Sequence, residues 1–587
     1  MDLAAGFPAT TRDGWRALAL AVLRKSGVEA ATPEQALGAL TYDGVPIAPL
    51  YDASDLPPVP PFDRGSARAG WDVRQRHAVP DPEAVLTDLE NGVTSLWLVA
   101  GDGAIPVVEL PRVLKDVLLD LAPIVLDAGP HTREAAEALF ALAGDTPLTG
   151  NLGASALDDS GVELAARCVT GHPGLRAITV DATPYHDAGA SDGEELGCSI
   201  ALGVAALRAL TGAGLSVEQA FGQLEFRYSA TDDQFATIAK LRAARKLWAR
   251  VAEVCGGGSQ DAYAQVQHVV TSSAMMTARD PWVNMLRTTV ACFAAGIGGA
   301  DAVTVQPFDA AVRPPDAFSR RIARNTQALL LEEAGAGRVA DPAGGSWYVE
   351  RRTADLAARA WEWFQEIEAA GGIRAAAGKV AGRVAATRAR RAADIAHRRL
   401  PITGVSEFPD PAERPLRRPA APKPPAGATT SVQPPGTAAE RGTGLPVVRY
   451  AAEFEALREL ADAQPERPKV FLATIGPAAA HTARAAFAAN LFQAGGLAVE
   501  SAGPGADAER IAAAFAASGA AVACLCSTDK LYAEHAEEVA AALRRAGARR
   551  VWLAGKGSHP GVDACLFAGC DALDVLRTTF RDLEVTA

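Results

Sequence analysis

The chain has 587 residues, of which 49% are hydrophobic and 21% are charged. This length exceeds what one hydrophobic core usually supports, so two or more domains are expected. The net charge of -12 and the pI near 5.4 argue against nucleic acid or an anionic membrane as the main partner. We find neither a signal peptide nor an apolar stretch of roughly 18 residues, so a cytoplasmic protein is expected.

The first 40 residues contain one clear helical pattern, DGWRALALAVLRK at 13–25. It precedes the first β-rich run and is separated from it by a stretch without regular periodicity. We assign residues 1–40 to an N-terminal extension that contacts a partner. The apolar residues of the helix fit equally well as a cover for the chain's own core, and the sequence leaves both possibilities open.

Short β-rich runs then alternate with helical patterns. The runs lie at 95–101, 123–129, 148–154, 177–183, 223–229, 266–272 and 302–309, and the best candidate for an eighth is 339–350. Strand and helix alternation at this count predicts a parallel sheet closed as a (β/α)8 TIM barrel, with an open doubly wound sheet as the alternative. Residues 351–400 are predicted to form long helices packed outside the barrel.

A Pro-rich stretch separates this region from the rest of the chain. Residues 401–445 are dense in Pro, Gly, Ala and Thr, which predicts an extended linker. After it, five further β-rich runs alternate with Ala-rich helical patterns: 469–475, 497–503, 520–527, 549–557 and 570–577. Five strands in so short a segment indicate a flavodoxin-like doubly wound domain.

Candidate metal and phosphate motifs are weak. The eight cysteines form no Cys-x-x-Cys pair and lie mostly in apolar runs, so we interpret them as small buried residues. The glycine-rich stretches at 255–261 and 334–338 lack the strand, helix and Lys-Ser/Thr context of a phosphate loop and are interpreted as turns. No metal site is predicted.

Two stretches carry a family resemblance. PPFDRGSARAGWDVRQRH (60–77) and RIARNTQALLLEEAGAGRVADPAGGSWYVE (321–350) closely resemble the barrel of the acyl-CoA mutases that use adenosylcobalamin, methylmalonyl-CoA mutase above all. A barrel, a linker and a small flavodoxin-like domain is also the architecture of that family. The resemblance implies a radical rearrangement that interconverts methylmalonyl-CoA and succinyl-CoA, with the cofactor supplying the chemistry.

The same resemblance points to a lost cofactor site in the second domain. The family carries Asp-x-His-x-x-Gly after the first strand of this domain, where the His ligates cobalt and the Asp orients it. Here Ala478, Ala480 and Ala483 stand at these three positions. His481 is one residue out of register and has Ala479 where the Asp would be needed. We interpret it as an exposed histidine at the start of a helix.

The barrel motifs are also altered. Catalytic members have a loop with a Tyr and an Arg that contact the acyl-CoA, whereas residues 66–70 are SARAG. Arg68 is interpreted as a solvated charge. The family's catalytic His belongs to Gly-Tyr-His-x-x-Glu-Ala-Gly-Ala, and an alignment of TPYHDAGA (183–190) without gaps puts Pro184 there. His186 is two residues away, and we expect a structural hydrogen bond from it.

The sequence therefore predicts an N-terminal extension at 1–40, a mutase-like barrel at 41–400, a linker at 401–466 and a degenerate cobalamin-binding-like domain at 467–587. We assign no catalytic, cofactor-binding or metal-binding residue to this chain. The resemblance implies a non-catalytic small subunit, paired with a large subunit that binds adenosylcobalamin and substrate. The alternatives are a mutase that uses His186 and His481 itself, and a degenerate module that binds CoA or delivers the cofactor.

Overall fold

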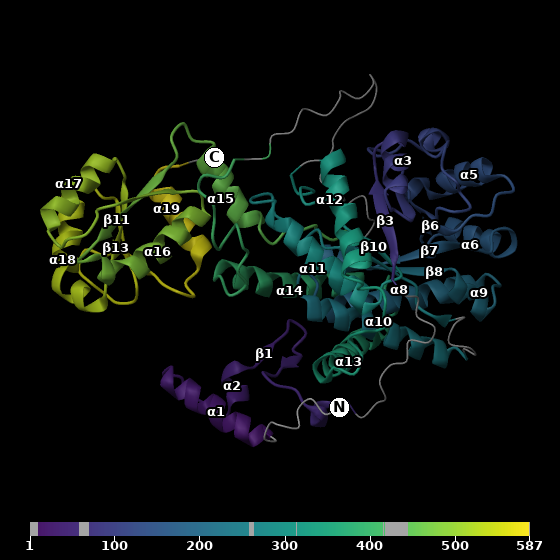
Figure 1. Ribbon diagram of the computed structural model, residues 1–587, viewed down its shortest axis with the longest axis horizontal. Coiled ribbons are helices and arrows are strands. Elements are labelled where there is room, and N and C mark those ends of the chain that lie inside the picture. The colour runs from purple at the N-terminus through teal and green to yellow at the C-terminus, as the bar shows by residue number, and fades with distance from the viewer. Residues whose placement is uncertain are drawn as a thin grey trace.

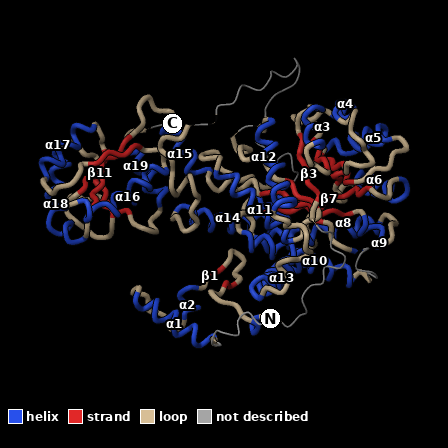
Figure 2. Tube along the Cα trace, in the orientation of Figure 1, coloured by secondary structure: helices blue, strands red, loops and turns tan. Residues whose placement is uncertain are grey.

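The computed structural model describes residues 10–57, 70–256, 263–312, 314–414, 416 and 444–585. Two sets of parallel strands, each surrounded by helices, lie apart from one another in Figure 2. The larger set belongs to the N-terminal two thirds of the chain and the smaller one to the C-terminal part (Figure 1).

The larger set is a closed barrel in the order β10-β3-β4-β5-β6-β7-β8-β9, and every neighbouring pair is parallel. The strands are β3 (Asp72–His77), β4 (Ser95–Val99), β5 (Ile124–Asp127), β6 (Gly150–Ala154), β7 (Leu175–Asp181), β8 (Leu224–Ala230), β9 (Gln267–Thr271) and β10 (Ala302–Thr304). The predicted (β/α)8 barrel is confirmed, and the alternative of an open sheet is wrong.

The prediction of the eighth strand was wrong. Residues 339–350 form turns followed by the start of α13 (Trp347–Ala369), because the Asp-Pro-Ala-Gly-Gly segment favours turns. The missing strand is β3, whose sequence DVRQRH has no apolar run. Its Arg74 is buried because the side chain forms an ion pair with Glu225 at 2.6 Å, a partner that periodicity cannot reveal.

Helices surround the barrel. They are α3 (Pro82–Glu90), α4 (Leu110–Val113), α5 (Thr132–Ala143), α6 (Asp159–Gly171), α7 (Thr183–Asp187), α8 (Asp192–Gly212), α9 (Val217–Gly222), α10 (Gln234–Val254), α11 (Val283–Gly298) and α12 (Ala317–Ala328). The predicted outer helices are α13 and α14 (Ala377–Ala396), and α13 packs against α8 and α10.

Among the described residues, α8 alone is long and apolar enough to cross a membrane, but 61% of that stretch is buried inside the protein, as in a core helix.

The smaller sheet has the order β12-β11-β13-β14-β15, which is the flavodoxin-like order 2-1-3-4-5. Its strands are β11 (Lys469–Thr474), β12 (Ala498–Ser501), β13 (Val522–Cys526), β14 (Arg550–Ala554) and β15 (Ala564–Leu566). Its helices are α16 (Ala478–Ala494), α17 (Ala508–Ser518), α18 (Asp529–Arg545) and α19 (Ala572–Asp582). The predicted doubly wound domain is confirmed.

The expected fifth strand of this domain is a helix. Residues 570–577 lie mostly in α19, where Asp571 caps the N-terminus and Leu573, Leu576 and Phe580 are buried at helical spacing. The fifth strand, β15, lies just before it and has only three residues. A strand of this length gives too short an apolar run to be detected by pattern.

Parts of the predicted linker at 401–466 are folded. Ile402 and Val405 are buried in the core of the small domain, and α15 (Ala452–Asp462) packs against α19. Two apolar residues in a turn give no periodic signal, which is why the sequence did not indicate this packing. Residues 417–443, the Pro-rich centre of the predicted linker, lie outside the described residues.

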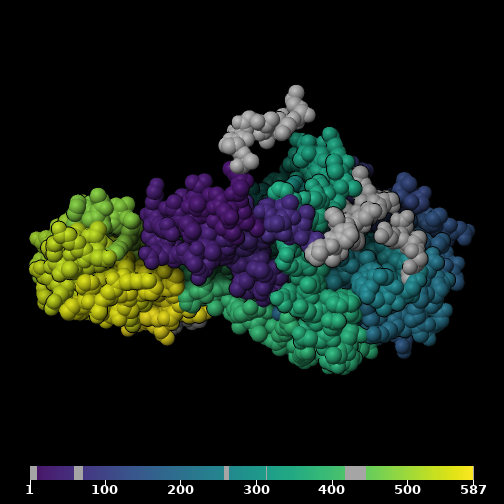
Figure 3. All heavy atoms as spheres, turned by 90° about the horizontal axis from the view of Figure 1, so that it is seen from below, coloured from purple at the N-terminus to yellow at the C-terminus, as the bar shows by residue number. Residues whose placement is uncertain are grey.

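The N-terminal segment consists of α1 (Arg12–Lys25), α2 (Pro33–Leu37), β1 (Ala39–Leu40), β2 (Pro46–Ile47) and the 3-10 turn η1 (Ala53–Asp55). The helix predicted at 13–25 is confirmed. None of the residues of α1 is buried, and Leu18 and Val22 are 71% and 63% exposed. The segment is attached to the rest of the chain through Tyr42 and Asp43, and it lies on one face of the molecule in Figure 3.

Candidate functional site

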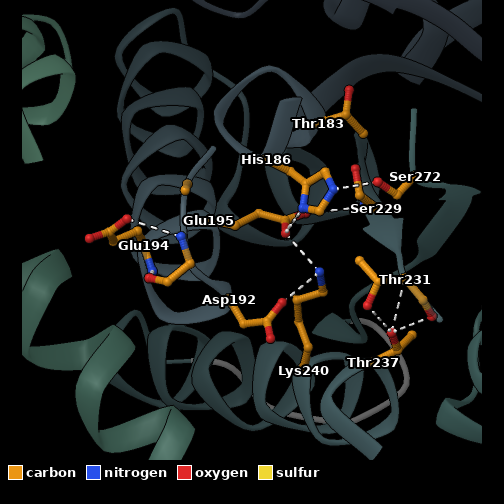
Figure 4. A network of polar contacts seen from close by, with 12 residues as sticks. Thr183, His186, Asp192, Glu194, Glu195, Ser229, Thr231, Thr237, Lys240 and Ser272 are labelled. Atoms are coloured by element: carbon orange, nitrogen blue, oxygen red, sulfur yellow. Dashed lines mark hydrogen bonds and ion pairs between the residues drawn. The ribbon is translucent and has the colours of Figure 1, made fainter. Parts of the chain in front are cut away.

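His186 lies at the barrel mouth, the end of the barrel at which the carboxyl ends of its strands meet. It belongs to α7, directly after β7, and its ring is 3% exposed. Nε2 is 2.7 Å from Oγ of Ser272 just beyond β9, and Nδ1 is 3.7 Å from Oε2 of Glu195 on α8 (Figure 4). The structure thus contains the hydrogen bond expected of His186. Pro184 is buried on the same short helix.

Lys240 on α10 is fully buried beside His186 and pairs with two carboxylates of α8 (Figure 4). Its Nζ is 2.8 Å from Oε2 of Glu195 and 3.0 Å from Oδ1 of Asp192. Burial lowers the pKa of Lys240, but the two carboxylates outweigh it and raise that pKa above its ordinary value. The other oxygen of Glu195 accepts the backbone N–H of Ser229 at the end of β8. Together, these contacts of Lys240 and Glu195 join α8, α10 and the barrel strand β8.

Sequence reasoning missed this contact, which we call the Lys240 ion triad. Lys240 lies in the helical run IAKLRAARK and Glu195 in an apolar helix, so each was hidden among core positions. A charged residue on the buried face of a helix was the only available signal. Ser191 and Glu194 form a capping box at the start of α8.

The environment of His186 keeps its ring neutral. Burial lowers the pKa of His186 well below its ordinary value, and the positive charges of Lys240 and Arg391 lower it further. Nε2 is in a hydrogen bond with the Ser272 hydroxyl. This arrangement orders the mouth and leaves the ring without direct access to solvent.

Charged and aromatic side chains meet inside the barrel below His186. Arg74 on β3 contacts Glu225 on β8, and Arg227 on β8 lies 3.4 Å from Asp127 on β5. These strands are not neighbours in the barrel, so their side chains must cross its interior. The indole ring of Trp97 lies under the guanidinium group of Arg227, 4.3 Å from its ring centroid. The interior at this level is therefore occupied by ion pairs and an aromatic ring.

Residues 58–69, including Arg68, lie outside the described residues, and Gly70 is the first residue described after them.

The carboxyl edge of the small sheet carries no polar side chain at the three expected positions. Ala478, Ala480 and Ala483 lie in the first two turns of α16. Arg484 follows them and crosses the edge: its guanidinium donates to the carbonyl oxygen of Ser527 at 2.8 Å and to Asp529 at 2.6 Å.

Tyr532 on α18 and Leu531 complete this edge. The guanidinium of Arg484 lies 5.2 Å from the ring centroid of Tyr532, whose hydroxyl accepts the backbone N–H of Ser527 and lies 2.8 Å from the carbonyl oxygen of Ala554. Leu531 packs on Gly476, where an added Cβ would lie 2.5 Å from Cδ1 of Leu531. Side chains of the chain itself thus cover the ends of β11, β13 and β14.

His481 is buried, so the prediction of an exposed histidine at the helix start was wrong. It does lie in the first turn of α16, but it is only 8% exposed. It falls on the same helix face as the buried Ala488 and Phe492, which follow it at helical spacing. Neither ring nitrogen is accessible to solvent or has a hydrogen-bond partner among the described residues.

The cysteines are all free thiols. Five of them are buried as predicted, but Cys255 is exposed and Cys565 and Cys570 are half-buried. Within the described ranges, no group of three or more His, Cys, Asp or Glu residues is placed to hold a metal ion.

Comparison with known proteins identifies the family. The methylmalonyl-CoA mutase family model matches residues 158–425. The methylmalonyl-CoA mutase small subunit of Streptomyces virginiae is 54% identical to this chain, over 100% of the chain and 98% of that protein. The chain belongs to the methylmalonyl-CoA mutase family. The small subunit of Propionibacterium freudenreichii subsp. shermanii is 38% identical over 100% of this chain and 97% of its own length.

A large subunit is also related to this chain. The methylmalonyl-CoA mutase large subunit of Streptomyces virginiae is 39% identical over 40% of this chain and 32% of its own length. Within the mutase family, similarity along the whole length therefore connects this chain with small subunits, and a shared segment connects it with a large subunit. Family membership makes the chain an isomerase subunit.

The Lys240 ion triad yields a stability prediction. Lys240→Met leaves the carboxylates of Asp192 and Glu195 buried without a cation, which should lower the free energy of unfolding by about 3–5 kcal/mol. Lys246→Met makes the same change on α10 at a half-buried position and should cost less than about 1 kcal/mol. Urea denaturation of both variants measures the difference. Equal effects would show that the triad does not hold the barrel mouth.

Proposed function

We propose that the chain is the non-catalytic small subunit of a heterodimeric methylmalonyl-CoA mutase. In this proposal a large subunit binds adenosylcobalamin and substrate and interconverts methylmalonyl-CoA and succinyl-CoA. One observation carries the proposal. Side chains of this chain occupy the two places where the family resemblance leads one to expect a ligand, and the chain is similar to a small subunit along its whole length. The cytoplasmic location predicted from the sequence belongs to the same proposal.

The carboxyl edge of the small sheet does not fit cobalamin. A bound cofactor would need a ligand for cobalt and an open crevice for its nucleotide tail. Ala480 offers no ligand, and the ring nitrogens of His481 are buried. Arg484 and Tyr532 contact each other across the strand ends, where the tail would have to approach the backbone. We therefore assign the cofactor to the large subunit.

The barrel interior supports the same conclusion for the substrate. A CoA chain that ran through the barrel would have to displace the ion pair between Arg74 and Glu225 and the contact of Arg227 with Trp97. Removing one partner of a buried ion pair costs several kcal/mol, because the other charge remains in a low-dielectric interior. These contacts favour a packed barrel that serves as a scaffold.

The N-terminal helix is the best candidate for contact with the large subunit. Leu18 and Val22 on α1 are exposed, and neighbouring turns of this helix add the half-buried Trp15 and Leu23. A helix with five large apolar residues, Leu20 included, and no buried residue gains little from the chain to which it belongs. A partner that covers this face would explain why the helix is retained.

The activity of the assembled complex tests the absence of an active site. With His186→Gln or His481→Ala in this chain, turnover should stay within about twofold of the unchanged complex, because neither ring reaches a ligand. Ser272→Ala is a second variant at the barrel mouth and should behave in the same way. Size-exclusion chromatography should show intact complex in each case. A fall of about 10²-fold or more in an intact complex would mean that this barrel takes part in general acid or base catalysis.

Binding to the large subunit tests the assignment of α1. Leu18→Asp and Val22→Asp together should raise the dissociation constant at least tenfold, roughly the loss expected for a central apolar contact. Arg24→Asp, on the opposite side of the helix, is the matched control and should change it less than threefold. Sedimentation velocity measures both. If the double variant binds normally, the helix has another role.

A further inference from the structure

A cavity of about 680 Å³ lies between the barrel mouth and α14. Its wall includes Gly189 and Gln306 from the barrel, Arg388 and Arg391 from α14, and residues 447–450 from the segment before α15. This volume is in the range of small-molecule sites. Figure 1 shows α14 leading from the barrel toward the small domain, so the cavity lies where the two parts of the chain meet.

Backbone hydrogen bonds fix one wall of the cavity. The N–H of Val448 donates to the carbonyl oxygen of Asp187 at 2.8 Å, and that of Tyr450 donates to the carbonyl oxygen of Ala274 at 2.9 Å. Segments far apart in sequence are thus joined directly around the space. The cavity is therefore a defined part of the fold.

Two arginines on the wall have no carboxylate partner among the described residues. Arg391 is 8% exposed and donates to the carbonyl oxygens of Gly189 and Ala190, which accept hydrogen bonds but carry no net charge. Arg388 makes one long contact, 3.5 Å, to a carbonyl oxygen. In the part of the chain that the structure describes, no carboxylate oxygen lies within 4.0 Å of either guanidinium. Arg391 is buried and lies over the rings of Tyr42 and Tyr450, 4.6 and 5.3 Å from their centroids, and Arg388 is half-buried. Aromatic rings attract a cation but carry no net charge, and buried charges in proteins are normally paired, so Arg391, with Arg388 on the same wall, indicates a place for an anion.

The other charged groups of the wall are already paired. Arg449 forms an ion pair with Glu455 at 2.5 Å. Glu453, the one carboxylate among the described residues of the wall, is exposed and forms an ion pair with Arg577. The net charge that faces the cavity therefore comes from Arg388 and Arg391.

Most of the remaining surface is apolar. Met276, Ala311, Ala392, Ile395 and Val447 all contribute to it. We propose that the cavity binds a small amphipathic anion, with its acidic group beside Arg388 and Arg391 and its apolar body against Ala311 and Ala392. The inference stands apart from the proposed subunit function, because it concerns a site made only by this chain.

The fluorescent sulfonate 8-anilinonaphthalene-1-sulfonate is a suitable probe, because it joins an anionic group to an apolar ring system. Titration of the isolated full chain should give saturable binding to one site. Arg388→Gln should raise the dissociation constant tenfold or more, as expected when a hydrogen bond to a charged group is lost. Arg390→Gln is the matched control: it removes an exposed arginine from α14 that does not line the cavity, and it should change the constant less than twofold.

Two further measurements separate this site from general surface binding. Ala392→Trp should abolish the saturable component by filling the cavity, while the melting temperature of the variant confirms that it folds. Octanoate should displace the probe and 1-octanol should not, because only the former carries a charge. Binding without saturation, equal effects of Arg388→Gln and Arg390→Gln, or displacement by both octyl compounds would overturn the proposal. None of these results depends on the large subunit, so they leave the proposed function untouched.

Discussion

The contact of Lys240 with Asp192 and Glu195 is the interaction on which the barrel mouth depends. It places a charged amine at full burial and balances it with two carboxylates of the neighbouring helix. Glu195 then holds the end of β8 through the N–H of Ser229 and lies beside His186. Because a buried charge is costly without its partner, these groups are fixed together. His186 is held in the same buried cluster through its contacts with Ser272 and Glu195.

Internal contacts occupy both places where the family resemblance leads one to look for a site. In the barrel, ion pairs between strands that are not neighbours cross the interior, as with Arg74 and Glu225. At the small sheet, Arg484 lies against Tyr532 over the ends of the strands. Each contact takes space from a ligand. The chain is thus consistent with a scaffold whose cores are self-sufficient, apart from the exposed helix α1 and the cavity beside α14.

The sequence predicted the architecture well because the signal lay in apolar periodicity. Seven of the eight barrel strands and four of the five strands of the small sheet overlap the β-rich runs predicted from the sequence. The sequence did not predict the other two strands, β3 and β15, for physical reasons. In β3 the inward position of Arg74 is charged and depends on a partner about 150 residues away, and β15 is only three residues long. Neither property is visible in a local window.

The sequence predicted the surroundings of the candidate site residues less well than it predicted the fold. The absence of a cofactor site at Ala478, Ala480 and Ala483 stays a prediction from the resemblance, whereas the hydrogen bond expected of His186 is present. The burial of His481 was not expected, because its helix has alanine on most faces and periodicity did not mark the inner one. The Lys240 ion triad and the unpaired charges of Arg388 and Arg391 depend on tertiary neighbours. Only the folded chain shows them.

The electron paramagnetic resonance spectrum of cobalt(II) in the assembled complex tests the central claim most directly. A protein imidazole that ligates cobalt splits the signal, and the splitting pattern changes when its nitrogen-14 is replaced by nitrogen-15. The complex is prepared with nitrogen-15 histidine in this chain alone. Our account predicts a spectrum identical to that of the unlabelled complex, because it assigns the cofactor to the large subunit. A pattern that changes with the label would place a histidine of this chain on cobalt and contradict the account.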